Sequence, residues 1–280
     1  MMCRKSFVFS FLFILCASVG YAQTPSPTPE RETGFLRRSV TLRLITIDYR
    51  VYIPLGYDPA KKYPVILYLH GRGARGNDNE KQIGGAHLGS VIQLFDMKYP
   101  ERYRSFIAVF PQTQRSWFGE SAEDAIKALD QTVREFNGDP QRIYLMGASA
   151  GGYGSWYLAA KYPNKFAAVV PLSGWVRTSG VQPLASVKSL MPAEMFALYS
   201  APDPYAAFAK AIGKTPVWIF HGGQDDTIDV NESRKMAAAL KAAGGAVKYT
   251  EYPEEKHFIA DRVFTDVEFW KWLMAQKLAQ

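Results

Sequence analysis

Cysteine is nearly absent from this chain of 280 residues, which contains only Cys3 and Cys16. Both lie in an N-terminal segment where two basic residues precede an apolar run from Phe7 to Val19 that ends in small residues. This pattern is typical of a secretory signal, and we expect cleavage after Ala22 to leave residues 1–22 as the signal. The mature chain would then have no thiol for a disulfide, a metal site or a nucleophile.

Long hydrophobic runs are also missing. The run from Phe7 to Val19 spans 13 residues, whereas a membrane-spanning helix needs about 20, so we expect no stable membrane insertion. Leu15 stands directly before Cys16 where a lipoprotein signal would carry a small residue, which argues against a lipid anchor. These features predict a secreted or periplasmic protein.

Charge of one sign is not concentrated anywhere in the chain. The formal net charge of +7 falls to +5 when Arg4 and Lys5 leave with the signal, and the other positive residues are scattered. Nucleic-acid recognition normally needs a dense basic patch, so we expect no nucleic-acid partner. The sequence does not indicate the oligomeric state.

Residues 23–34 are rich in proline and hydroxylated residues, which favours an extended, solvated linker. Residues 35–280 are enough for one α/β domain with a buried core. Alternating apolar residues from Val40 to Ile53 predict an antiparallel edge hairpin. Continuous apolar runs then alternate with amphipathic segments, which predicts a mostly parallel, doubly wound sheet. The predicted strands are Val65–Leu69, Phe106–Phe110, Ile143–Met146, Ala167–Pro171, Val217–Phe220 and Val247–Tyr252; the predicted helices are Ala122–Phe136, Ser149–Lys161, Glu232–Ala243 and Phe264–Leu278.

A glycine-rich turn follows the strand Ile143–Met146 and leads directly into a helical pattern. Its sequence is Gly147-Ala148-Ser149-Ala150-Gly151, the G-x-S-x-G pattern of a nucleophile elbow. Glycines are needed because side chains two residues from the serine would collide with the neighbouring strand and helix. The alternative is a serine that only caps the helix, but the position between strand and helix favours a nucleophile.

A serine hydroxyl needs a base, normally a histidine that an acid orients. The chain has four histidines, His70, His87, His221 and His257. Hydrolases with this elbow carry nucleophile, acid and base in that chain order, which excludes His70 and His87. Because His221 ends an apolar strand, a structural role fits it, and His257 is the candidate base.

Three acidic residues follow the strand Val217–Phe220. Asp225 is nearest to the strand end and is the predicted acid. Asp226 is the adjacent rival, and Asp229 fits better as the N-cap of the next helix.

Attack on a carbonyl creates an oxyanion, which two backbone N–H groups normally stabilise. We expect one from Ala150 and the other from Arg72, with Gly71 as an alternative to Arg72. The loop that contains Gly71 and Arg72 also matches the G-x-G-x-x-G pattern of dinucleotide sites, and Asp96 lies beyond it in the sequence. However, Asn77-Asp78-Asn79 continues a loop where such a site requires a helix. We therefore expect no cofactor and no metal.

Five segments together resemble a known group. They resemble the phospholipase/carboxylesterase and dienelactone-hydrolase-like branch of the α/β-hydrolases, which includes secreted feruloyl and acetyl-xylan esterases, polyhydroxybutyrate depolymerases and peptidases of prolyl-oligopeptidase type. The resemblance spans residues 40–275 and implies an α/β-hydrolase fold. The segments are Leu69-His70-Gly71-Arg72-Gly73, Val109-Phe110-Pro111-Gln112, Gly147-Ala148-Ser149-Ala150-Gly151-Gly152-Tyr153-Gly154, Phe220-His221-Gly222-Gly223-Gln224-Asp225-Asp226 and the loop around His257.

The resemblance implies a serine hydrolase that cleaves a small or polysaccharide-linked carboxylic ester through an acyl-enzyme, with feruloyl or acetyl esters as candidate substrates. A serine peptidase and a non-catalytic binding protein on a hydrolase scaffold are the alternatives. In relatives the loop of Trp117 lies near the active site, so Trp117 is either a substrate contact or a buried anchor. The segment from Trp175 to Thr215 is unusually long. We expect it to cover the core or to form a cap, in which Trp175 would contact substrate.

Overall fold

The computed structural model describes residues 32–42, 45–84, 105–177, 186 and 188–278. Residues Glu32–Gln280 form one compact unit. The predicted signal lies outside the described residues, as does the linker up to residue 31. Both interpretations therefore stay predictions.

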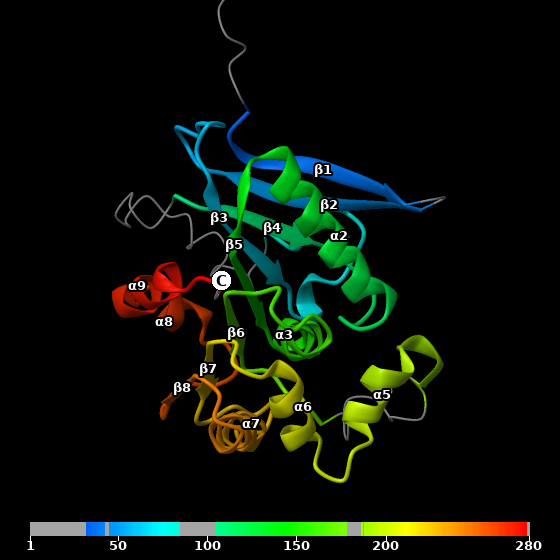
Figure 1. The fold of residues 1–280 in the computed structure, drawn as a ribbon, viewed down its shortest axis with the longest axis vertical. Helices are drawn as coiled ribbons and strands as arrows, with labels where there is room; N and C mark the ends of the chain where they lie inside the picture. The colour runs from blue at the N-terminus through cyan, green and yellow to red at the C-terminus, as the bar shows by residue number, and fades with distance from the viewer. Residues whose placement is uncertain (1–31, 43–44, 85–104, 178–185, 187, 279–280) are drawn as a thin grey trace, which may run out of the picture. The chain divides into compact units, whose positions relative to one another are not determined.

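The described residues contain one mostly parallel sheet of eight strands in the order β1-β2-β4-β3-β5-β6-β7-β8 (Figure 1). Strand β2 is antiparallel to both β1 and β4, and every other neighbouring pair is parallel. This confirms the predicted α/β sheet with an antiparallel hairpin at its edge. The strands are β1 Gly34–Leu42, β2 Ile45–Ile53, β3 Tyr63–Leu69, β4 Ile107–Pro111, β5 Gly138–Ala148, β6 Ala168–Leu172, β7 Val217–Gly222 and β8 Val247–Tyr252.

Helices cover both faces of the sheet (Figure 1). Successive side chains of a strand point to opposite faces, so Val65 and Leu67 of β3 join one core cluster and Ile66 and Tyr68 join the other. Helices α2, α3, α5, α6 and α7 contribute to the first cluster, whereas α8 and α9 contribute to the second. The helices are α2 Glu120–Glu135, α3 Ala150–Lys161, α5 Ala193–Tyr199, α6 Pro204–Ile212, α7 Asn231–Ala242, α8 Ala260–Phe264 and α9 Val267–Ala275, with 3-10 turns η1 Arg72–Ala74 and η3 Lys188–Leu190.

The C-terminal helix differs from the prediction of one helix over Phe264–Leu278. The chain instead forms α8, which ends at Phe264, and α9, which begins at Val267. Asp266 lies between them and its side chain accepts a hydrogen bond from the N–H of Glu268. An aspartate that bonds the first-turn N–H groups starts a new helix, and this local signal divides the apolar pattern.

Strand β5 begins at Gly138, five residues before the predicted start at Ile143. Polar residues occupy this first part, so an apolar-run criterion misses it. The strand still pairs with β3, from Tyr63↔Gly138 and, after a register shift, from Val65↔Ile143. Backbone pairing, which apolar patterns do not report, extends the strand.

The described part of the 175–215 segment packs against the main core. Met195, Tyr199 and Phe208 are buried in the same cluster as α3. The ring of Tyr199 stacks on Tyr153 of α3, with centroids 5.6 Å apart. These contacts favour the core-covering role over a free cap.

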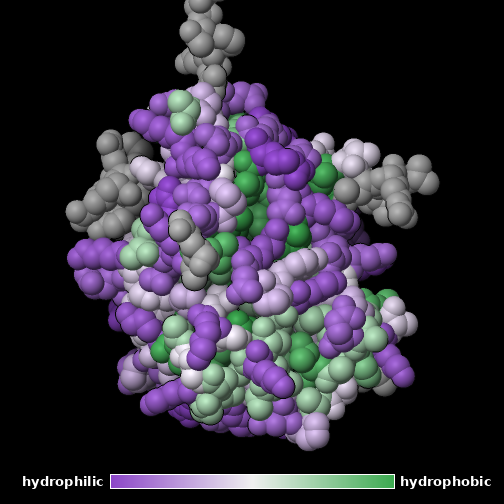
Figure 2. All heavy atoms as spheres, viewed as in Figure 1, coloured by the Kyte–Doolittle hydropathy of each residue, from purple (hydrophilic) through white to green (hydrophobic). Residues whose placement is uncertain are grey.

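Hydrophilic atoms dominate the face drawn in Figure 2, and pale green atoms gather in the region where Figure 1 places α6 and α7. Both helices are rich in alanine, and small exposed apolar side chains are ordinary on a protein surface. Among the described residues, the large hydrophobic side chains with high exposure are Leu55, Leu190, Phe258 and Val267. No helix in this part of the chain is long and apolar enough to cross a membrane.

Candidate active site

Ser149 lies in a strained turn between β5 and α3. Its φ is 56° and its ψ is −115°, and a positive φ is uncommon for a residue with a side chain. A Cβ at Gly147 would overlap the carbonyl oxygen of Gly151, and a Cβ at Gly151 would overlap that of Leu69. Only glycine at both positions allows the turn to close, which is the crowding expected of the elbow.

The carboxyl ends of the parallel strands bring Ser149, which follows β5, and His257, which follows β8, to the same edge of the sheet. The N–H of Ser149 donates to the carbonyl oxygen of Leu172, the last residue of β6, at 2.8 Å. The next residue, Ser173, donates its hydroxyl to the carbonyl oxygen of His257 at 3.0 Å. Consecutive residues at the end of β6 therefore hold both the elbow and the histidine loop.

The imidazole of His257 is bonded to Asp225. His257 Nδ1 lies 2.7 Å from Asp225 Oδ2, and the two side chains are 6% and 0% exposed. No hydrogen bond joins the Ser149 hydroxyl to this imidazole among the residues that the structure describes. Such bonds are often long in a free enzyme and tighten when substrate binds.

Asp225 is held as a carboxylate. Burial by itself would raise its pKa, but hydrogen bonds from His221, His257 and the N–H groups of Ile228 and Thr227 together bring the pKa well below its ordinary value. The two N–H groups both donate to Oδ1 at 2.9 Å. An anion fixed in this way can orient the Nδ1–H of His257 and stabilise an imidazolium.

The two other candidate acids lie elsewhere. Asp226 is exposed and pairs with Lys256, with 3.4 Å between Asp226 Oδ2 and Lys256 Nζ. Asp229 lies one position before the N-cap of α7, which is Val230 and not Asp229 as predicted. Its carboxylate nevertheless accepts a hydrogen bond from the N–H of Asn231 at 2.9 Å, so it still supports the start of the helix.

The remaining described histidines are buried and bonded. His70 Nδ1 bonds to the carbonyl oxygen of Gly71 at 2.8 Å, and its Nε2 accepts the N–H of Thr113 at 3.2 Å. Burial and, to a lesser extent, Arg75 lower the pKa of His70 to about 4. His221 is fully buried at the end of β7 and also contacts Asp225. His87 lies outside the described residues.

The loop after β3 comes close to the elbow. A Cβ at Gly71 would lie 3.5 Å from the Cβ of Ser149, an ordinary van der Waals contact, so the two backbone segments lie close together. Arg72 opens η1 and Ala150 opens α3. The first N–H groups of a helix have no acceptor within it, and this applies to the N–H groups of Arg72 and Ala150.

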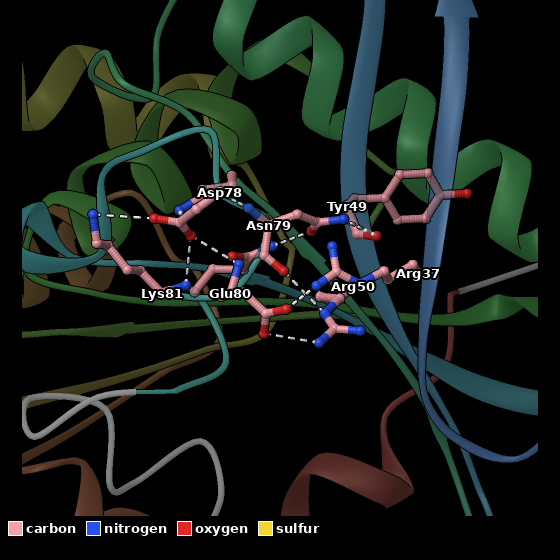
Figure 3. A network of polar contacts seen from close by, with 9 residues as sticks. Arg37, Tyr49, Arg50, Asp78, Asn79, Glu80 and Lys81 are labelled. Atoms are coloured by element: carbon pink, nitrogen blue, oxygen red, sulfur yellow. Dashed lines mark hydrogen bonds and ion pairs between the residues drawn. The ribbon is translucent and has the colours of Figure 1, made fainter.

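Polar contacts fasten the continuation of this loop to the sheet (Figure 3). Glu80 pairs with Arg37 of β1 and with Arg50 of β2. Arg50 Nε also donates to the carbonyl oxygen of Asn79 at 3.0 Å, and Asn79 donates to that of Tyr49. Residues 75–84 contain no helix, whereas the dinucleotide fingerprint requires one there. Asp96 lies outside the described residues.

Both tryptophans predicted as substrate contacts are buried. Trp117 is 1% exposed, and its Nε1–H donates to the carbonyl oxygen of His70 at 2.8 Å. Trp175 is 8% exposed and stacks on Tyr153, with centroids 5.3 Å apart. Stacking on a substrate would require either ring to leave its packing, so the geometry favours structural anchors.

A cavity of about 370 Å³ lies beside Arg75, and its lining includes none of Ser149, Asp225 and His257. Arg75 and Ser116 line it and are bonded to each other, with Arg75 Nη2 donating to Ser116 Oγ at 2.8 Å. Phe118 and Leu190 add apolar surface. No group of three or more metal-ligating side chains occurs in the described parts of the chain.

Sequence reasoning missed Ser173. It is 1% exposed with a φ of 45°, and its hydroxyl holds the backbone of His257. The signal available in the sequence was weak: Ser173 and Gly174 directly follow β6, and a Cβ at Gly174 would lie 2.9 Å from the Cα of Gly152 in α3. Only the packing of β6 against α3 reveals why this turn is tight.

The fold and the geometry of this site define an α/β-hydrolase. A model of the prolyl oligopeptidase family matches residues 110–275, which is more than half of the chain. The chain therefore belongs to the prolyl oligopeptidase family of serine hydrolases.

Relatives include both peptidases and esterases. An uncharacterised peptidase of Bacillus subtilis is 27% identical over 70% of this chain and 31% of its own length. A carboxylesterase of Arabidopsis thaliana is 25% identical over 73% of this chain and 88% of its own length. The crystal structure of a thermostable esterase is 26% identical, with a TM-score of 0.68 over 87% of this chain and 63% of that chain. The chain spans between 23% and 34% of the first curated relatives that it matches.

Proposed function

We propose that this protein hydrolyses carboxylic esters through an acyl-enzyme on Ser149. The 2.7 Å contact between His257 Nδ1 and Asp225 Oδ2, at the sheet edge that carries the Ser149 elbow, is the observation that supports this proposal most directly. It leaves Nε2 of His257 as the ring nitrogen that can accept a proton from a hydroxyl.

The proposed reaction has two halves. Ser149 Oγ attacks the ester carbonyl while His257 Nε2 takes the hydroxyl proton, and the N–H groups of Ala150 and Arg72 stabilise the oxyanion. His257 then returns the proton to the leaving alcohol as the acyl-enzyme forms. In the second half, His257 activates water, which attacks the acyl group and releases the acid. Asp225 remains ionised throughout and stabilises the imidazolium.

An activity-based label and a serine variant test the nucleophile. A fluorophosphonate probe should label the native protein at Ser149, and Ser149→Ala should abolish labelling and lower ester turnover about 10⁶-fold, as loss of a triad serine does. The matched control is Ser155→Ala, because Ser155 lies in the same helix with its hydroxyl bonded to the carbonyl oxygen of Gly151. If the probe does not label the native, folded protein and the protein turns over no ester, the result would support the alternative of a non-catalytic binding protein.

A peptidase is the second candidate, and the family match favours it. Peptidases of this type share the triad but must also protonate an amine leaving group. We expect a p-nitrophenyl ester to turn over faster than the p-nitroanilide of the same acyl group. Comparison of kcat/KM for this pair measures the preference, and a higher value for the anilide would reverse the assignment.

We propose acetyl and feruloyl esters of plant polysaccharide as the substrate classes. We also propose that the protein is exported from the cell. The resemblance to secreted esterases and the N-terminal pattern support this. A panel of acetyl, feruloyl and short-chain alkyl esters would rank the acyl groups, and N-terminal sequencing of the exported protein would locate the cleavage site.

A further inference from the structure

Asp225 receives a second imidazole besides His257. His221 Nε2 lies 3.0 Å from Asp225 Oδ2, the same oxygen that His257 Nδ1 approaches to 2.7 Å. Both His221 and the Asp225 side chain are fully buried. The other carboxylate oxygen accepts the N–H groups of Thr227 and Ile228. Four donors therefore surround the carboxylate, which is about the number that its two oxygens can accept.

The hydrogen-bond partners of His221 determine which of its ring nitrogens carries a proton. Nε2 faces two groups that can only accept, the Asp225 carboxylate and the carbonyl oxygen of Ile228 at 3.1 Å. Nε2 must therefore carry a proton, and in a neutral ring Nδ1 must be the acceptor. Ser233 of α7 lies 2.7 Å from Nδ1 and supplies a hydroxyl donor. Ser233 thus donates to His221, and His221 in turn donates to Asp225.

We propose that His221 is a positioning residue of the active site. Its Nε2–H fixes Asp225 Oδ2 at Nδ1 of His257, and Ser233 selects the tautomer that makes this N–H available. The inference rests on the proposed function, since it assigns a role to His221 in the same reaction. A strand-terminal histidine with a purely packing role would need no contact with the acid.

The shared oxygen has an electrostatic consequence. The N–H of His221 draws negative charge away from Oδ2, so less of that charge remains to stabilise protonated His257. Removal of the N–H should therefore strengthen the attraction between Asp225 and a protonated His257. Glu251 of β8 is the other charged group that interacts with His221; it lies opposite His221 in the β7–β8 register and is engaged by Arg234 of α7.

Two substitutions at His221 separate positioning from packing. His221→Phe keeps a ring but removes both nitrogens, whereas His221→Gln keeps an N–H donor on a side chain of similar length. We expect His221→Phe to lower kcat about 10- to 100-fold with little change in KM, because misplaced catalytic groups cost rates of this order. His221→Gln should recover most of the loss. Ile219→Val, in the same buried strand, is the control for a simple packing defect and should retain the native kcat.

A titration provides a readout that does not depend on turnover. In a Ser149→Ala background, NMR follows the His257 imidazole against pH, and the His221→Phe change should move its titration midpoint to higher pH. Ile219→Val should leave the midpoint unchanged. If His221→Phe does not fold, Ser233→Ala is the second variant, because it leaves the imidazole in place. It should also move the His257 midpoint to higher pH and lower kcat, each by a smaller amount than expected for His221→Phe.

The outcomes distinguish this inference from the proposed function. Folded His221→Phe with the native kcat and the native midpoint would overturn the positioning role. An equal loss of kcat in His221→Phe and Ile219→Val, with neither midpoint moved, would also overturn it. If the wild-type protein turns over no ester or amide, while His221→Phe still shifts the His257 midpoint in the Ser149→Ala background, the proposed function is refuted and the contact between His221 and the acid is supported.

Discussion

Two adjacent aspartates in the loop after β7 have different surroundings, although they are one position apart in the sequence. Asp225 is enclosed by two imidazoles and two backbone N–H groups, whereas its neighbour Asp226 faces solvent and Lys256. Both carry the same carboxylate, so composition cannot separate them. The direction of the backbone after the strand separates them, because it turns only Asp225 towards His257.

Alanine substitutions at these two positions should therefore differ sharply. Asp225→Ala should lower kcat about 10³- to 10⁴-fold, because His257 loses the partner that fixes its tautomer and stabilises its charge. Asp226→Ala removes only an exposed ion pair, which contributes about 0–1 kcal/mol, and should keep near-native turnover. Steady-state kinetics on one ester measures both, and the opposite ranking would identify Asp226 as the acid.

At the scale of elements, apolar patterns predicted every strand after the hairpin to within a few residues, except the start of β5. They worked best for β3, β4 and β6, which are buried along their whole length and leave almost no polar positions. Polar residues at the start of β5 and the single Asp266 between α8 and α9 escaped the pattern. Strand pairing and helix capping, which depend on backbone partners, decided those boundaries.

The loops at the sheet edge were less accessible to sequence reasoning than the strands. Chain order and the elbow pattern identified Ser149 and His257 as candidates without any coordinates. Ser173 was missed because its partner, His257, lies far away in the sequence. His221 was assigned only a structural role because no sequence pattern reports that the turn after β7 brings Asp225 back onto its imidazole. His221 Nε2 contacts Asp225, and the Ser173 hydroxyl, directly after β6, donates to the carbonyl oxygen of His257 in the loop after β8.

At the scale of the whole molecule, His70 should make stability depend on pH. Its pKa is lowered from 6.5 to about 4 because burial and, to a lesser extent, Arg75 disfavour the protonated ring, against the opposing effect of the hydrogen bond to Gly71. Between these values the unfolded chain binds the proton more strongly, so the free energy of unfolding falls as the pH drops from 6.5 towards 4. A shift of this size corresponds to about 3 kcal/mol.

Chemical denaturation at several pH values tests this expectation. The His70→Asn variant, which has no titrating ring, should lose about 3 kcal/mol less than the native protein between pH 6.5 and 4. The lowered pKa of Asp225 acts in a separate window, since the stability it provides is present above its ordinary value of 3.8 and is lost below it. Parallel pH curves for the native protein and His70→Asn would show that His70 does not titrate as proposed.

The amino-acid sequence specifies, without any coordinates, the alternation of strands and helices, the elbow around Ser149 and the order of the candidate nucleophile, acid and base. These are local patterns or constraints of chain order, and they need no knowledge of what lies across the fold. The sequence favoured Asp225 over Asp226, but the folded structure was needed to show that this carboxylate meets His257, that His221 shares it, and that Trp117 and Trp175 are enclosed. Each depends on which residues become neighbours when distant strand ends align at one edge of the sheet.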